Sequence, residues 1–109
     1  MKEKQALDMF GALSQGTRLQ VVRYLVRCGP DGASAGEVSA EVGASSSRAS
    51  FHLSALENAG LVSSERQSRK IIYRADLGNL GGLVSFLLND CCGGHPDVLA
   101  CCGLPDGCC

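Results

Sequence analysis

The clearest hydrophobic pattern in the chain is helical and begins after Ser45. Apolar residues recur at the spacing of one helix face at Ala49, Leu53 and Leu56. The side-chain oxygen of Ser45 can accept a hydrogen bond from a free N–H of the first turn, and Gly60 supplies the positive-φ residue at which many helices end. The pattern therefore predicts a helix between Ser45 and Gly60 with a buried apolar face and a polar outward face.

A β-hairpin is predicted directly after this helix. The β-rich runs Leu61-Val62 and Ile71-Ile72-Tyr73 flank a polar turn at Gln67-Ser68-Arg69, which is the pattern of two short paired strands. Basic side chains gather on this segment, so its surface is expected to be positively charged.

Four further segments have helical patterns. They are residues 5–13, 17–27, 35–42 and 77–89, with Ser14 and Ser34 as the expected caps of the second and third. The expected apolar positions are Leu7, Phe10 and Leu13 in the first and Leu19, Val22, Leu25 and Val26 in the second. Two short helices joined by a tight turn, the second with a polar face, form a helix-turn-helix. With the hairpin added, the predicted fold class is mainly α with a β-hairpin wing, a winged helix-turn-helix.

The last of these helices is apolar on most of its surface. Its apolar residues are Leu77, Leu80, Leu83, Val84, Phe86, Leu87 and Leu88. Such a helix needs partners on two sides, and it is either a core helix of a monomer or shared between two subunits. We expect a homodimer held by this helix (Leu80, Val84, Leu87) and the first helix (Leu7, Phe10), because a chain of 109 residues has little core in which to hide it.

The polar face of the helix between Ser45 and Gly60 suits a DNA groove. It carries Ser46, Ser47, Arg48, Ser50 and Ser54. Short side chains allow close approach to base edges and phosphates, and Arg48 can reach a guanine or a phosphate. The candidate contacts of the hairpin with the flanking DNA backbone are Arg66, Arg69, Lys70 and Arg74. The alternative is a solvated helix face and a solvated turn.

Charge and cysteine are distributed unevenly along the chain. All ten Lys and Arg lie in residues 1–76 against eight Asp and Glu, whereas residues 77–109 hold three Asp and six of the seven cysteines. The chain has no apolar run of about 18 residues and no basic-then-apolar leader, so a cytoplasmic protein without a membrane partner is expected. An enzyme is not expected, because there is no Ser/His/Asp set, no Gly-rich phosphate loop and only two histidines.

Two blocks of the chain resemble the signature of the ArsR/SmtB family of winged-helix repressors. They are residues 10–19 (FGALSQGTRL), and residues 44–53 (ASSSRASFHL) continuing at 56–62 (LENAGLV). Members of this family bind operators as homodimers and dissociate from the DNA when a metal or metalloid binds. The resemblance covers residues 5–90 and implies that Ser46, Ser47, Arg48 and Ser50 face the major groove, with the hairpin as the wing. His52 matches a His of the signature and is expected to pack between helices rather than to bind metal.

The metal sites of many members of this family are missing from the chain. Residues 35–41 (AGEVSAE) contain no Cys-x-Cys of the kind found in many arsenic-sensing members. Residues 76–89 contain neither the His nor the Glu of the paired ligands that zinc-sensing members use. Neither site can therefore form in this chain.

A cysteine-rich tail, residues 91–109, follows the predicted DNA-binding domain, residues 1–90. It holds Cys-Cys pairs at 91–92, 101–102 and 108–109, and clustered cysteines inside cells are more often soft-metal ligands or redox centres than structural disulfides. As(III) or Sb(III) needs three thiolates. The candidate ligands are Cys91 and Cys92 with either Cys101 or Cys102, which the Gly-Gly-x-Pro turn can bring back. The tail is similar to that of a subgroup of arsenic repressors whose cysteines follow the last helix.

The predicted function is a homodimeric repressor that leaves operator DNA when arsenite or antimonite binds the tail cysteines. Three alternatives stay open. The tail can bind Zn(II), Cd(II) or Pb(II), through four cysteines or three cysteines and His95. It can sense redox state by forming disulfides, or it can scavenge metal without regulating DNA binding.

Overall fold

The computed structural model describes residues 1–91 and 93–102, except for the side chains of residues 90, 91, 99, 101 and 102. Its helices are α1 (Glu3–Leu13), α2 (Gly16–Cys28), α3 (Ala35–Val42), α4 (Ser46–Ala59), α5 (Leu77–Ser85) and α6 (Pro96–Cys102), with a 3₁₀ turn η1 (Gly29–Asp31) and a π-helical turn η2 (Phe86–Cys91). Its strands are β1 (Ala33–Ser34), β2 (Val62–Gln67) and β3 (Lys70–Ala75). The helix-turn-helix is α3–α4 and the wing is β2–β3, so the predicted fold class is confirmed.

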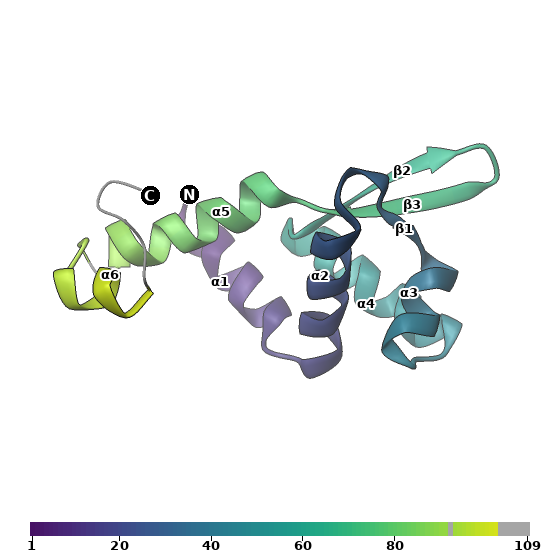
Figure 1. Ribbon diagram of the computed structural model, residues 1–109, viewed down its shortest axis with the longest axis horizontal. Helices are drawn as coiled ribbons and strands as arrows, with labels where there is room; N and C mark the ends of the chain where they lie inside the picture. Colours follow the sequence, from purple (N-terminus) through teal and green to yellow (C-terminus); the bar gives the residue numbers. More distant parts are fainter. Residues whose placement is uncertain (92, 103–109) are drawn as a thin grey trace.

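Helices α1 to α4 form the body of the molecule, and the other elements extend from it in opposite directions. The β2–β3 hairpin projects at one end, while α5 leads away at the other and carries α6 (Figure 1). The molecule is accordingly elongated, with extents of 47 × 23 × 23 Å. None of the helices in the described part of the chain is long and apolar enough to cross a membrane.

The sheet has three antiparallel strands in the order β1-β3-β2. The β2–β3 ladder closes with the pair Gln67–Lys70, so Gln67 belongs to the ladder and the turn is only Ser68 and Arg69. Ser68 takes the left-handed conformation there, with φ 57°. The sequence did not predict β1, because a strand of two residues is too short to show an alternating pattern.

The core lies between α1, α2, α3, α4 and the start of the hairpin. Its largest fully buried side chains are Met9, Val21, Leu25, Val38, Leu53, Leu56 and Leu61. Leu83 and Leu88 of the last helical segment are buried as well. The predicted apolar face of α4 is therefore the face that packs on the rest of the domain.

Leu7, an expected apolar position of α1 and of the dimer contact, is 61% exposed in the single chain. Ala6, Met9 and Ala12 are buried instead. Helix α1 carries two overlapping apolar stripes, and its packing against α4 selects the stripe with the smaller side chains. The larger Leu7 is left on the surface.

The predicted apolar face of α2 was wrong in part. Leu19 and Val26 are 44% and 41% exposed, whereas Val21 is fully buried. The expected cap Ser14 is wrong too, since the side chain of Gln15 accepts the hydrogen bond from the first turn of α2. Ser14 instead donates to the carbonyl oxygen of Gly11 at the end of α1, at 2.7 Å.

The last helical segment is two-sided, as its composition predicts. It continues without a break from α5 through η2, which ends at Cys91. Leu83 is buried against the body, whereas Val84 beside it is 45% exposed. One side of the segment thus belongs to the core and the other has no cover within the described residues.

We expect the substitution Leu53→Ala to lower the free energy of unfolding by ~2–5 kcal/mol, because it leaves a cavity where a fully buried side chain of α4 fills the core. Urea unfolding followed by circular dichroism measures the change. The control is Ser54→Ala, the exposed neighbour on the same helix. Equal unfolding midpoints for the two variants would contradict this packing of α4.

Candidate nucleic-acid interface

Helix α4 is fixed at both ends and along one side. Ser45 caps its start, where the hydroxyl accepts a hydrogen bond from the backbone N–H of Arg48 at 3.3 Å, and Gly60 ends it at φ 88°. Ala49, Leu53 and Leu56 are fully buried. These local and tertiary constraints together determine which side chains of α4 point outward.

The side chains predicted to face the DNA groove are on the outward face of α4. Ser46, Ser47, Arg48 and Ser50 are all exposed. Sequence reasoning missed Phe51, whose side chain is 65% exposed on the same face. The signal was present, since Phe51 is two positions from both Ala49 and Leu53 and therefore lies about 200° around the helix from the apolar stripe.

Arg18 of α2 holds His52 and Phe51 of α4 together. The Arg18 Nε donates a hydrogen bond to His52 Nδ1 at 3.2 Å, and the guanidinium lies over the Phe51 ring, 5.6 Å from its centroid. Burial, with smaller contributions from the positive charges of Arg18 and Arg48, lowers the pKa of His52. The expectation that His52 packs between helices is confirmed, because its Nδ1 accepts the hydrogen bond from Arg18 in the α2–α4 contact.

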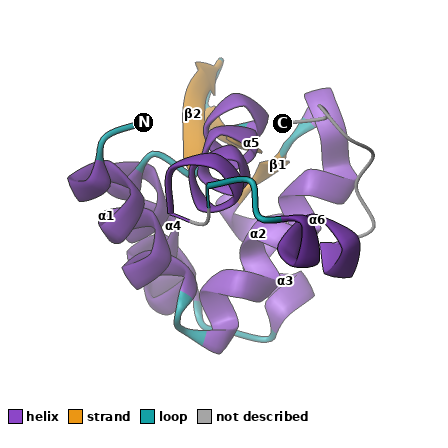
Figure 2. Cartoon of the chain, turned by 90° about the vertical axis from the view of Figure 1, so that its left-hand side faces the viewer, coloured by secondary structure: helices purple, strands orange, loops and turns teal. Residues whose placement is uncertain are grey.

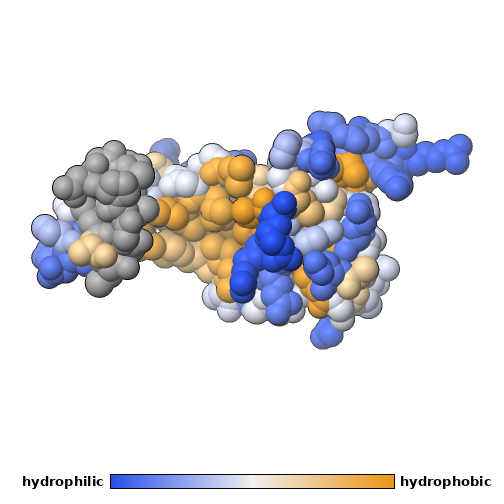
Figure 3. Space-filling view, viewed as in Figure 1, coloured by the Kyte–Doolittle hydropathy of each residue, from blue (hydrophilic) through white to orange (hydrophobic). Residues whose placement is uncertain are grey.

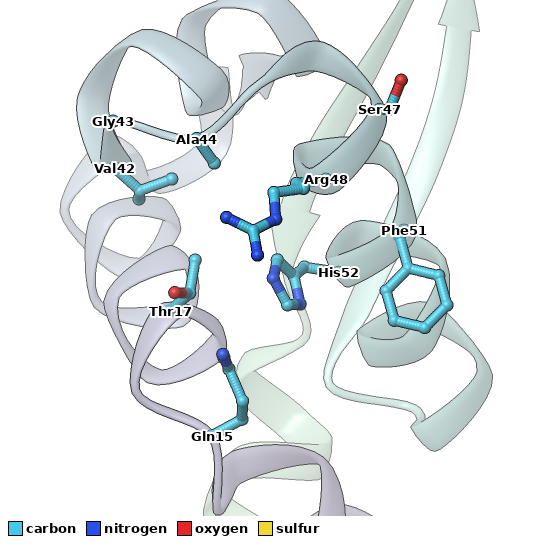
Figure 4. Close-up of a pocket in the computed structure, with 9 residues that line it drawn as sticks. All are labelled: Gln15, Thr17, Val42, Gly43, Ala44, Ser47, Arg48, Phe51 and His52. Carbon is cyan, nitrogen blue, oxygen red and sulfur yellow. The ribbon is translucent and has the colours of Figure 1, made fainter.

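A polar hollow of about 430 Å³ opens beside this contact, between the start of α2, the α3–α4 turn and α4 (Figure 4). Its lining residues are Gln15, Thr17, Val42, Gly43, Ala44, Ser47, Arg48, Phe51 and His52. We call it the α2–α4 hollow. Figure 4 shows the guanidinium of Arg48 pointing into it rather than straight outward from the helix.

Local hydrogen bonds fix both the start of α3 and the α3–α4 turn, which forms one wall of this hollow. Ser34 and Glu37 form a reciprocal capping box at the start of α3, with distances of 3.2 and 3.0 Å. The hydrogen bonds from the backbone and side chain of Ser34 lower the pKa of Glu37. Gly43 ends α3 at φ 68°, and Ser39 Oγ donates to the Ala44 carbonyl oxygen at 2.6 Å.

The basic residues of the wing divide into two groups. Arg66, Arg69 and Lys70 are exposed near the hairpin turn, as predicted. Arg74, which was expected to act with them, has partners within the domain. Its Nε donates to the Pro30 carbonyl oxygen at 2.7 Å and its guanidinium pairs with Glu65 at 3.6 Å, so Arg74 ties the wing to the η1 turn.

A second hollow lies on the other side of α4, between α3 and the wing. Its volume is about 390 Å³. It is lined by Ser34, Ala35, Gly36, Ser50, Arg69, Lys70, Ile71 and Tyr73. The exposed face of α4 is therefore flanked by two hollows, and each of them contains cationic side chains.

Hydrogen bonds join the C-terminal end of α4 to the start of α5. The side-chain nitrogen Nδ2 of Asn79 donates to the Gly60 carbonyl oxygen at 2.8 Å and to Asp76 Oδ2 at 3.2 Å. Asp76 in turn caps α5 and donates its backbone N–H to the Leu61 carbonyl oxygen at 2.9 Å. The orientation of α5 is thus tied to the residue at which α4 ends.

An apolar surface runs over α1, α5 and the start of η2 (Figure 3). It includes Leu7, Leu77, Val84 and Leu87, which are between 41% and 61% exposed. We call this set the α1–α5 surface. Phe10 and Leu80, which are also expected at the dimer contact, are half-buried and pack partly against the core.

The cysteine tail begins with a reversal of the chain direction after η2. Gly93 and Gly94 have positive φ, and the Gly94 N–H donates to the Leu88 carbonyl oxygen at 2.6 Å. Helix α6 follows this turn (Figure 2). Of the predicted metal ligands, Cys92 lies outside the described residues, as do the side chains of Cys91, Cys101 and Cys102.

The described side chains offer few other metal ligands. No group of three or more His, Cys, Asp or Glu that could hold a metal ion occurs among them. His95 is exposed, and its Nδ1 accepts a hydrogen bond from the Asp97 N–H at 3.2 Å. Cys28 is half-buried, and its thiol raises the pKa of Tyr24 through a hydrogen bond.

Comparison with known proteins agrees with this architecture. The model of a helix-turn-helix domain family matches residues 13–65. The HTH-type transcriptional regulator YgaV of Escherichia coli (strain K12) is 32% identical over 89 residues, which cover 82% of this chain and 88% of YgaV.

Solved structures show the same fold. An ArsR-like transcriptional regulator from Rhodococcus sp. RHA1 superposes with a TM-score of 0.73 at 28% identity, covering 89% of both chains. The homodimeric winged helix-turn-helix DNA-binding domain of Mb0332 from Mycobacterium bovis does so with a TM-score of 0.64 at 26% identity, covering 85% of this chain and 86% of that domain.

The fold and its exposed helix face define a DNA-binding transcriptional regulator rather than an enzyme. The chain belongs to the ArsR/SmtB family of winged helix-turn-helix regulators.

Proposed function

We propose that the chain is a homodimeric repressor that binds operator DNA through residues 1–90 and is released when arsenite or antimonite binds cysteines of residues 91–109. The observation that carries the DNA-binding part is the exposed face of α4, where Ser46, Ser47 and Ser50 lie between two hollows with cationic side chains. Helix α4 enters the major groove and the wing follows the adjacent backbone.

The wing contributes affinity without reading sequence. Arg69 and Lys70 are exposed beside the second hollow, and neither forms an ion pair with another described residue. Cationic side chains of this kind bind phosphates and release counterions, which makes the affinity dependent on salt. The neighbouring Arg66 is more restrained, because its Nε donates to the Ser68 carbonyl oxygen at 3.3 Å.

Dimerisation is supported by the α1–α5 surface. Leu7, Leu77, Val84 and Leu87 are large apolar side chains that water otherwise contacts, and a second copy of the same surface is their proposed cover. A two-fold dimer of this kind sets the spacing between two α4 helices and therefore favours a palindromic operator.

The tail supplies a donor set that suits a soft, pyramidal ion. Cys91, Cys92 and one of Cys101 or Cys102 would hold As(III) or Sb(III) as three thiolates. Support comes from the glycine turn at Gly93-Gly94, which reverses the chain between the two cysteine pairs. A ligand bound there would bias the last helical segment, and α5 is hydrogen-bonded through Asn79 to the end of α4.

For DNA binding, we expect the double substitution Arg69→Gln, Lys70→Gln to weaken binding of operator and of unrelated DNA by similar factors. The slope of log Kd against log salt should fall by about 2, since each lost phosphate contact contributes about 0.9. Fluorescence anisotropy on an operator selected from a random-sequence library measures both effects. The control, Lys2→Gln, Lys4→Gln, removes the same charge at the start of α1. Indistinguishable slopes for the two double variants would rule out the wing contact.

For assembly, we expect Val84→Asp to convert the dimer into a monomer, because a carboxylate cannot be buried in an apolar interface without a partner. Sedimentation equilibrium of the unaltered protein and the variant measures the state. The matched control is Ile71→Asp, which places the same charge at an apolar position on the wing that is 47% exposed. If the Val84→Asp variant is still a dimer, the interface lies elsewhere on the molecule. If the unaltered protein is a monomer, the proposed dimer does not exist.

For the inducer, we expect the double substitution Cys91→Ser, Cys92→Ser to preserve operator binding and abolish release by arsenite. The unaltered protein should lose operator affinity by ~10-fold or more, in the usual range of such couplings. A gel shift under reducing conditions, titrated separately with arsenite, antimonite, cadmium, zinc and lead, measures release.

The control for this experiment is Cys28→Ser, which removes a cysteine from α2 and should change neither binding nor release. Release by cadmium, zinc or lead alone would replace the metalloid with a divalent metal. Release only after removal of the reductant would indicate a thiol-redox sensor. Release of the tail double variant by arsenite would move the sensor out of Cys91 and Cys92.

A further inference from the structure

The α2–α4 hollow has an inner surface that favours an anion. Its polar lining residues are Gln15, Thr17, Ser47, Arg48 and His52, and Figure 4 shows the hydroxyl of Ser47 directed away from it. Neither Asp nor Glu lines it. The guanidinium of Arg48 and the amide nitrogen of Gln15 therefore face a space that no carboxylate lines (Figure 4).

Arg48 is available to a ligand in this hollow. Its backbone N–H is used by the Ser45 cap, but its guanidinium forms neither a hydrogen bond nor an ion pair with any described residue. The other arginine nearby is occupied, because Arg18 donates to His52 and stacks on Phe51. The guanidinium that Figure 4 shows entering the hollow is therefore the free cation of this site.

Gln15 is oriented by the helix that it caps. Its side-chain oxygen accepts the hydrogen bond from the Arg18 N–H at 2.8 Å, and Figure 4 shows its amide nitrogen directed into the hollow. Gln15 and Thr17 belong to the start of α2, where the helix dipole adds partial positive charge.

The position of the hollow matches the path of a DNA strand. An α-helix about 10–12 Å across fills a major groove about 12 Å wide, so the phosphates of the two strands pass along the two sides of α4. Ser47 lies on the rim of the α2–α4 hollow and Ser50 on the rim of the hollow beside the wing. Each DNA strand thus passes a hollow with cationic side chains on its side of α4.

We propose that the α2–α4 hollow binds one backbone phosphate of the operator in each half-site, with Arg48 as its cationic ligand and Gln15 and Thr17 as further donors. This inference rests on the proposed binding of DNA through α4. Arg48 then fixes the depth and register of α4 in the groove and reads no base. Base recognition falls to Ser46, Ser47, Ser50 and the exposed ring of Phe51, which can contact a thymine methyl group.

The experiment replaces single operator phosphates by uncharged methylphosphonates and measures the affinity of the full-length protein by fluorescence anisotropy. For the unaltered protein we expect one position per half-site at which the replacement lowers affinity by ~10-fold or more, the usual scale of a charged hydrogen bond. Arg48→Gln should lose affinity by a similar factor on unmodified DNA. It should also be insensitive to the methylphosphonate at that one position while remaining sensitive at the others.

Two further variants distinguish a phosphate contact from base reading. Arg48→Lys should retain most of the affinity, because a lysine serves a phosphate as a point charge but does not reproduce a bidentate contact with guanine. Thr17→Val should lower affinity for operator and unrelated DNA by the same factor. The control is Lys4→Gln, which removes a charge from a side chain on α1 that is 90% exposed. It should change neither the affinity for the operator nor the affinity for unrelated DNA.

The outcomes separate this inference from the proposed function. If the unaltered protein binds the operator but Arg48→Gln stays sensitive at every methylphosphonate position, the hollow holds no phosphate, while DNA binding stands. Relaxed specificity at one base pair in Arg48→Gln, with unchanged affinity for unrelated DNA, would assign Arg48 to a base and overturn the inference. Failure of the unaltered protein to bind any DNA would overturn both. Urea unfolding verifies that each variant is folded.

Discussion

Burial of one apolar stripe of α4 is the constraint on which the DNA-binding surface depends. A polar helix of this length is only marginally stable in water by itself, and the full burial of Ala49, Leu53 and Leu56 attaches it to the domain. The same burial determines its rotation about its own axis. A shift of one residue would turn a helix face by about 100° and remove the serine face from the surface. The caps at Ser45 and Gly60 fix the length of α4, while the core fixes its direction.

The partners of the arginine side chains distinguish structural cations from those available to a ligand. Arg18 and Arg74 link elements that are distant in sequence, α2 with α4 and the wing with η1. Arg48 and Arg69 line the two hollows beside α4 and have no charged partner among the described residues. The net charge of −1 therefore says little about DNA binding, because the positive potential is local and depends on which guanidinium groups are already occupied.

The last helical segment joins three roles that would otherwise lie in separate parts of the chain. It carries part of the α1–α5 surface at Val84, it leads into the cysteine tail at Cys91, and it is tied at its start to the end of α4 through Asn79 and Gly60. A ligand changes DNA affinity only as far as it binds two arrangements of the protein differently. In the proposed mechanism this segment is the element whose two arrangements differ in the distance or angle between the α4 helices.

Local patterns in the sequence determined the helix-turn-helix, the wing and the outward face of α4, because caps, turns and helical periods depend on residues no more than a few positions apart. The tertiary structure alone decided which apolar stripe of α2 is buried, since Val21 and Leu19 both lie on plausible faces. It also decided that Arg74 anchors the wing and that Gln15 and Arg48 share one hollow. These outcomes arise from contacts between segments that are far apart in the chain. A local sequence pattern does not show which distant segments come into contact.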